Sequence, residues 1–110
     1  VSEIKKITTK VKELINEQYA GGITLESAAE SVYVSPHYLS MLFKKDTGIT
    51  FKEYLINYRI TKAKELLMDQ SLKIYQVAEM VGYGDWRYFS EVFKRITGQS
   101  PAQYRAALEQ

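Results

Sequence analysis

Hydrophobic residues recur every three or four positions along most of the chain. One run extends from Ile4 to Ile15, and a longer one extends from Phe51 to Leu67. This spacing predicts helices, because it puts hydrophobic side chains on one helix face. The strict alternation that marks a half-buried strand is not sustained anywhere. The pattern predicts an all-α fold of seven helices, over residues 2–19, 25–32, 36–46, 51–69, 73–81, 86–96 and 102–108.

The predicted helices have recognisable starts and ends. The two prolines follow serines, at Ser35-Pro36 and Ser100-Pro101. Serine accepts a backbone hydrogen bond as an N-cap, and the fixed φ of proline suits the first helical position. Gly48 and Gly98 each follow a helical run, where a left-handed residue is favoured. These signals support the predicted boundaries near residues 36, 48, 98 and 101.

The two halves of the chain resemble each other. The segment Phe43-Lys44-x2-Thr47-Gly48 recurs as Phe93-Lys94-x2-Thr97-Gly98, and Ala29-Glu30 recurs as Ala78-Glu79. Each copy consists of a short helix, a tight turn and a second helix, which is the helix-turn-helix pattern. A duplicated motif is more specific than a single one, which short helical pairs can mimic by chance.

Composition excludes several classes of protein. The chain has 110 residues, no cysteine and one histidine, which excludes a disulfide framework, thiolate zinc sites and cysteine nucleophiles. No hydrophobic stretch approaches the roughly 18 residues that span a membrane. No catalytic carboxylate pair or Ser/His/Asp arrangement is apparent. We therefore expect a cytoplasmic protein that is not an enzyme and has no metal, cofactor or membrane partner.

The charge is small in total but unevenly distributed. The net charge is +2 and the pI about 8.7, whereas nucleic-acid-binding domains usually exceed a pI of about 9. Basic pairs close the second helix of each copy, at Lys44-Lys45 and Lys94-Arg95, and acids lie on the preceding helices, at Glu26, Glu30 and Glu79. This separation of basic and acidic residues is expected of a protein that binds phosphates with one of its faces.

Two long motifs carry a resemblance to a known family. The first reads Ser35-Pro36-His37-Tyr38-Leu39-Ser40-x2-Phe43-Lys44-x3-Gly48-x2-Phe51-x2-Tyr54-Leu55. The second, more specific one reads Val77-Ala78-x2-Val81-Gly82-Tyr83-x4-Tyr88-Phe89-x3-Phe93-Lys94-x2-Thr97-Gly98-x-Ser100-Pro101-x2-Tyr104-Arg105. From about Ile23 to Arg105 the chain resembles the DNA-binding domain of AraC/XylS-type transcription regulators. It departs from the common pattern at Tyr33, where many relatives have glycine.

The resemblance implies two homeodomain-like helix-turn-helix subdomains joined by a long central helix. Residues 1–22 would then form a lead-in helix, 23–50 the first subdomain, 51–69 the central helix and 70–110 the second subdomain. At 1.5 Å per residue the central helix spans roughly 28 Å, comparable to the ~34 Å turn of B-DNA. Recognition helices 36–46 and 86–96 are expected in successive major-groove segments of double-stranded DNA.

The side chains expected to face DNA bases are His37, Ser40, Met41, Trp86, Arg87, Ser90 and Glu91. Arg87 is the strongest candidate, because arginine pairs bidentately with guanine, worth about 1–3 kcal/mol of discrimination. Its alternative role is a surface ion pair with Asp85 or Glu91, which is worth little.

Four other positions have open alternatives. His37 either contacts DNA or is a solvated residue at a helix start. Met41 either contacts a thymine methyl group or packs between helices. Glu91 either accepts a hydrogen bond from cytosine or orients Arg87. Trp86 either lies along the DNA backbone or covers the edge of the core.

A second set is expected to face phosphates, which adds affinity without sequence information. It comprises Ser35, Lys44, Lys45, Thr50, Lys52, Lys94 and Arg95. Backbone N–H groups at the helix starts of Thr50 and Ser100 are expected to contribute as well.

The resemblance also implies a larger regulator around this domain. The first helix, with its Glu17-x-Tyr19 end, is similar to the segment that precedes this domain in AraC-type response regulators, where a receiver domain comes before it. The alternative is a domain that senses a small ligand. RNA polymerase is a candidate partner. DNA-repair methyltransferases carry a similar module but need a nucleophilic cysteine. An alternative of a different class is a helical protein-interaction module.

Overall fold

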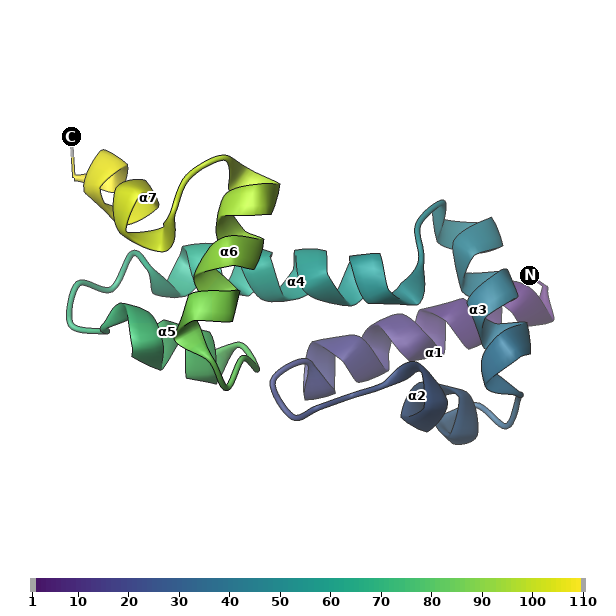
Figure 1. The fold of residues 1–110 in the computed structure, drawn as a ribbon. Coiled ribbons are helices and arrows are strands. Elements are labelled where there is room, and N and C mark those ends of the chain that lie inside the picture. Colours follow the sequence, from purple (N-terminus) through teal and green to yellow (C-terminus); the bar gives the residue numbers. More distant parts are fainter. Residues whose placement is uncertain (1, 110) are drawn as a thin grey trace. The chain divides into compact units, whose positions relative to one another are not determined.

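The computed structural model describes residues 2–109, and this part of the chain is all-α, as the sequence predicts. Its elements are α1 (Glu3–Gln18), α2 (Leu25–Ser31), α3 (Pro36–Thr47), α4 (Phe51–Leu66), α5 (Ile74–Met80), α6 (Trp86–Thr97) and α7 (Pro101–Leu108) (Figure 1). Most boundaries agree with the prediction to within one residue. The prediction for α4 was three residues too long at its end. There Met68 and Asp69 bond back to Glu65 and Leu66, so the chain tightens into a turn.

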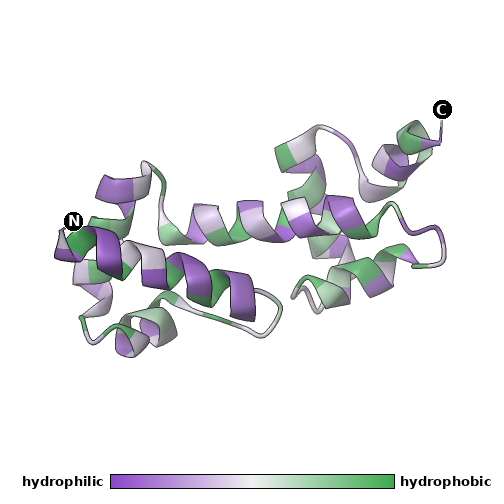
Figure 2. Cartoon of the chain, turned by 180° about the vertical axis from the view of Figure 1, so that it is seen from behind, coloured by the Kyte–Doolittle hydropathy of each residue, from purple (hydrophilic) through white to green (hydrophobic). Residues whose placement is uncertain are grey.

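The described residues form two units, divided inside α4 between Tyr58 and Arg59. Unit 1 ends at Tyr58 and unit 2 starts at Arg59. This division differs from the predicted segments, in which the whole of residues 51–69 joins two subdomains and residues 1–22 stand apart. In both units, hydrophobic and hydrophilic residues alternate in bands along the helices, as Figure 2 shows.

The core of unit 1 includes the lead-in helix. Val11 and Ile15 of α1 are fully buried, together with Leu39 and Phe43 of α3. Both α1 and α2 pack against α3, so the first helix-turn-helix rests on α1. Burial of these side chains stabilises unit 1 through the hydrophobic effect, and α1 is therefore an integral part of its core.

A polar cluster fixes α1 to the end of α3. The hydroxyl of buried Thr8 donates to Asp46 Oδ2 at 2.6 Å, and Lys5 Nζ lies 2.8 Å from Asp46 Oδ1. The Asp46 side chain is only 10% exposed. The hydrogen bonds from Lys5 and Thr8 lower the pKa of the Asp46 carboxyl below its usual value.

A row of aromatic rings builds the core of unit 2. Ring centroids are 5.6 Å apart for Tyr83 and Phe89, 5.8 Å for Phe89 and Phe93, and 5.5 Å for Phe93 and Tyr104. These distances are typical of stabilising aromatic pairs. The row links the turn before α6 to α7, so it holds α6 in place.

Arg105 of α7 bonds to the backbone at the end of α4, within unit 2. Its Nε donates to the Leu67 carbonyl at 3.0 Å, and its Nη2 donates to the Asp69 carbonyl at 3.1 Å. These carbonyls belong to the turn that ends α4, where helix acceptors lack partners in the helix. Arg105 therefore ties α7 to the end of α4.

Candidate nucleic-acid interface

The predicted repeat is present in the geometry of the two units. At the end of α3 the Thr47 hydroxyl lies 2.7 Å from the Phe43 carbonyl and 2.9 Å from the Ile49 carbonyl. At the end of α6 the Thr97 hydroxyl makes the equivalent contacts with Phe93 and Gln99 at 2.9 and 3.0 Å. The glycines that follow, Gly48 and Gly98, have φ of 85° and 86°. Thus α3 and α6, each preceded by a shorter helix, end in the same way.

Both of these helices start on a side-chain cap. Ser35 Oγ accepts a hydrogen bond from the Tyr38 N–H at 3.1 Å, and Asp85 Oδ1 accepts one from the Arg87 N–H at 2.9 Å. These caps satisfy N–H groups that lack a partner in the first turn. One oxygen of the Asp85 carboxylate is thus bonded to the backbone of Arg87.

Arg87 stacks on Trp86 and does not form the ion pair that was the alternative to a DNA contact. Its guanidinium carbon lies 5.3 Å from the centroid of the Trp86 ring. In the described part of the chain, neither Asp85 nor Glu91 forms an ion pair with its side chain. The ring and the guanidinium attract each other through a cation–π interaction. The Arg87 side chain therefore remains available to an external acceptor.

The side chains expected to face bases are accessible. His37, Ser40, Arg87 and Glu91 are exposed and Ser90 is half-buried. Met41 is 56% exposed and Trp86 47%, so neither is committed to the core. The inward face of each helix is filled instead by buried residues, which are Leu39, Leu42, Phe43, Phe89, Val92 and Phe93. Each helix thus presents one open face, within its own unit.

The expected phosphate-facing residues divide into two groups. Lys44, Lys45, Lys52, Lys94 and Arg95 are exposed, and no ion pair of theirs occurs among the described residues. They are therefore accessible to an external anion.

The hydroxyl residues of this set serve as caps. Thr50 Oγ1 accepts from the Glu53 N–H at 3.1 Å, and the Thr50 N–H donates to Glu53 Oε1 at 3.3 Å. Gln103 Oε1 likewise accepts from the Ser100 N–H at 2.9 Å. The N–H groups of Thr50 and Ser100 themselves are thus bonded within their caps, and a phosphate contact by other N–H groups at these helix starts stays a prediction. The hydroxyls that act as caps still have an O–H to donate.

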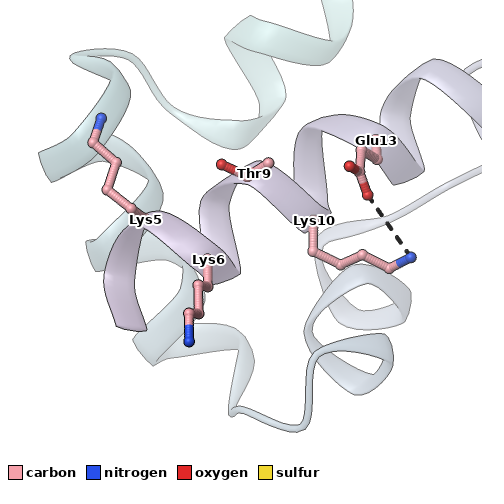
Figure 3. A pocket seen from close by; sticks show the side chains of 5 residues that line it. All are labelled: Lys5, Lys6, Thr9, Lys10 and Glu13. Atoms are coloured by element: carbon pink, nitrogen blue, oxygen red, sulfur yellow. Dashed lines mark ion pairs between the residues drawn. The ribbon is translucent and has the colours of Figure 1, made fainter. Parts of the chain in front are cut away.

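Sequence reasoning missed two surface features. A shallow hollow on α1 is lined by Lys5, Lys6, Thr9, Lys10 and Glu13 (Figure 3). Two of its lysines are paired, Lys5 with Asp46 and Lys10 with Glu13 at 3.9 Å. The clustering of lysines along residues 5–12 was the available signal. The second feature, a hydrophobic hollow at Ile74, Tyr75 and Trp86, joins two helices and has no signature in the sequence.

The described residues contain neither a metal-binding cluster nor a membrane-spanning helix. Within residues 2–109 no group of three or more His, Cys, Asp or Glu side chains could hold a metal ion. None of the helices in that range is long and hydrophobic enough to cross a bilayer.

The helix-turn-helix domain family matches residues 28–107. The uncharacterized HTH-type transcriptional regulator YijO of Escherichia coli K12 is 43% identical over 95 residues, which are 86% of this chain and 34% of that protein. The C-terminal domain of AraT, a response regulator from Geobacillus stearothermophilus, has a TM-score of 0.90 at 41% identity and covers 96% of this chain and 88% of that one.

The C-terminal domain of the two-component response regulator yesN from Fusobacterium nucleatum has a TM-score of 0.85 at 40% identity, covering 94% of this chain and 99% of that one. The DNA-binding domain of the global transcriptional factor AdpA, solved with a target DNA, has a TM-score of 0.85 at 28% identity, covering 91% and 90%. The chain spans less than half the length of the curated relatives it matches.

Proposed function

Because the chain belongs to the AraC-type family of helix-turn-helix domains that bind DNA in transcription regulators, we propose that it reads a two-part operator with α3 and α6. The observation that carries the proposal is the repeated open face on these helices. Each open face starts at a capped N-terminus and ends in a basic pair. Recognition helices of this class place such faces in the major groove.

We assign base reading first to Arg87. Its guanidinium has no acidic partner among the described residues and matches the O6 and N7 acceptors of guanine. His37, Ser40, Met41, Trp86, Ser90 and Glu91 complete the proposed base-facing set. The proposed phosphate contacts come from Ser35, Lys44, Lys45, Thr50, Lys52, Lys94 and Arg95, which fix the register of the domain on the duplex.

Arg87→Ala tests the proposal directly. An operator would first be selected from random duplexes, and binding measured by fluorescence anisotropy on the operator and on its single-base variants. Arg87→Ala should lose about 1–3 kcal/mol of discrimination at one guanine position, with little change on random duplex. Lys12→Ala, an exposed residue of α1, is the matched control and should leave both affinities unchanged.

Two outcomes would contradict this function. If the wild-type chain binds its selected duplex no better than random DNA, it is not a sequence-specific reader. If Arg87→Ala keeps full discrimination at every position, the base-reading role lies elsewhere. Circular dichroism of the variant separates both outcomes from misfolding. If the chain were instead a helical protein-interaction module, the wild type would show no preference among duplexes, and Arg87→Ala would change nothing measurable on DNA.

For the whole regulator, we propose the output domain of a bacterial response regulator acting in the cytoplasm. The similarity to the C-terminal domains of AraT and yesN supports this origin. The regulator would then carry a receiver domain and be controlled by phosphorylation. A small-ligand-sensing domain is the alternative, and RNA polymerase is a proposed partner of either. Sequencing the gene upstream of this segment distinguishes the two kinds of regulator.

A further inference from the structure

A hydrophobic hollow lies at the start of the second helix-turn-helix. It is lined by Ile74 and Tyr75 of α5 and Trp86 of α6. Tyr75 is 51% exposed and Trp86 47%. The inward face of α5 is formed by Val77 and Ala78, which are fully buried. Tyr75 and Trp86 are therefore not committed to the core, whereas Ile74 is half-buried.

The hollow adjoins the proposed base-reading face. Trp86 is the first residue of α6, and Arg87 follows it and stacks on its ring. In a helix-turn-helix, the start of the recognition helix is the part that approaches the bases. Tyr75 and Ile74 open α5, the first helix of the same motif. A duplex that meets Arg87 thus comes close to Trp86 and to the hollow beside it.

Charges of both signs lie around the hollow. Lys73 precedes Ile74 and is exposed, and Arg87 lies over Trp86. Neither residue forms an ion pair within the described residues. Asp85 precedes Trp86 and Glu79 lies one helical turn from Tyr75 on α5, and both acids are exposed. Because Arg87 is assigned to a base, Lys73 is the cation that remains for a phosphate beside the hydrophobic hollow.

We propose that Ile74, Tyr75 and Trp86 receive a deoxyribose of the DNA backbone at the edge of the groove that α6 enters. This contact assigns Trp86 to the DNA backbone, in place of the base-facing role given to it above. Each deoxyribose presents C–H groups next to a phosphate, which matches the hydrophobic hollow and Lys73 beside it. The inference rests on the proposed function, since it requires α6 to dock on DNA. It adds a contact that is hydrophobic, and thus differs in kind from those of Lys94 and Arg95.

A hydrophobic contact has a distinct thermodynamic signature. Each phosphate that a cation neutralises releases counterions, so the slope of log K against log salt counts ionic contacts. Burial of a ring against deoxyribose releases no counterion. The contact must therefore raise affinity equally on every sequence and leave this slope unchanged.

Three variants separate the hydrophobic contact from an ionic one. Tyr75→Ala should weaken binding about tenfold on both the operator and random duplex, with the wild-type salt slope. Lys94→Gln should instead reduce the slope by about 0.9. Met80→Ala is the matched control, since Met80 is 45% exposed at the opposite end of α5, and should bind as the wild type does. Unchanged affinity of Tyr75→Ala, or a reduced slope, would overturn the proposal.

Trp86 provides a second measurement without any mutation. It is the one tryptophan of the chain, so its emission reports on the hollow alone. Acrylamide is a neutral quencher, and it should quench Trp86 several-fold less efficiently in the DNA complex than in the free protein. Equal quenching in a saturated complex would overturn the proposal and leave the proposed function intact. Failure of the wild type to bind the selected duplex at all would instead overturn the proposed function. If Tyr75→Ala does not fold, the quenching of Trp86 in the wild-type complex tests the proposed sugar contact instead.

Discussion

Tyr33 is held in a backbone conformation that favours glycine. Its φ is 60°, and it is the single non-glycine residue with a positive φ among residues 2–109. At the matching place in the second copy the chain has Gly82, with a φ of 101°. The Tyr33 side chain is 94% exposed, so no packing compensates for the strain. Left-handed backbone costs a non-glycine residue about 1–2 kcal/mol.

Tyr33→Gly should therefore stabilise the protein. We expect the free energy of unfolding to rise by about 1 kcal/mol, because the relief of strain exceeds the greater entropy of glycine in the unfolded chain. Urea unfolding followed by circular dichroism measures the difference. Gly98→Ala is the reverse control, because Gly98 has a φ of 86° and open space around it, and it should destabilise by a similar amount. A loss of stability in Tyr33→Gly would show that the ring has a packing role.

At the scale of single residues, the sequence predicts features that depend only on residues close by in the chain. The cap at Ser35 and the left-handed glycines at positions 48 and 98 follow from local rules, and the structure has them. The contact of Thr8 with Asp46 could not be predicted, since 38 positions separate the two residues. The hollow at Tyr75 and Trp86 was missed for the same reason. Local signals do not state which residues meet across helices.

At the scale of elements, Asp46 makes the attachment of α1 to α3 sensitive to pH. Its pKa is lowered by the hydrogen bonds from Lys5 and Thr8. A carboxyl with a lower pKa in the folded state stabilises the fold above its unfolded pKa, near 3.8. That contribution is lost as the pH falls through the folded pKa. The relevant window is therefore from about pH 4 downward.

Asp46→Asn should make the free energy of unfolding depend less on pH under acidic conditions. We expect the free energy of unfolding of the wild type to fall more steeply below about pH 4 than that of the variant. Urea titrations at pH steps between about 5 and 2 measure both curves. Lys5→Met removes the ion pair from the other side and should reduce this dependence as well. Parallel curves for wild type and Asp46→Asn would mean that this carboxyl does not couple to folding.

The helices themselves could be predicted from local signals in the sequence. Their existence and most of their ends follow from hydrophobic period and caps. The end of α4 was misplaced because the hydrophobic stripe runs on to buried Leu67, whose N–H still bonds to Ala63, and the chain tightens into a turn at Met68 and Asp69. The place of α1 in the core of unit 1 depends on contacts of Val11 and Ile15 with α3, which no local pattern specifies.

At the scale of the whole molecule, the net charge understates the positive charge of the proposed DNA-binding surface. The net charge of +2 includes acids that lie on α2 and α5, such as Glu26, Glu30 and Glu79. The cations that end α3 and α6 are exposed and form no ion pair in the described part of the chain. Binding strength should therefore follow the local charge of these two helix ends.

The salt dependence of binding tests this distribution. Each phosphate contact contributes about −0.9 to the slope of log K against log salt. Lys45→Gln and Arg95→Gln should each make the slope shallower by about 0.9, on operator and random duplex alike, and the double variant should add the two effects. Lys12→Gln changes the net charge by the same amount on α1 and should leave the slope unaltered. If Lys12→Gln moved the slope as far as Arg95→Gln does, total charge would govern binding and the assignment of phosphate contacts to the ends of α3 and α6 would be wrong.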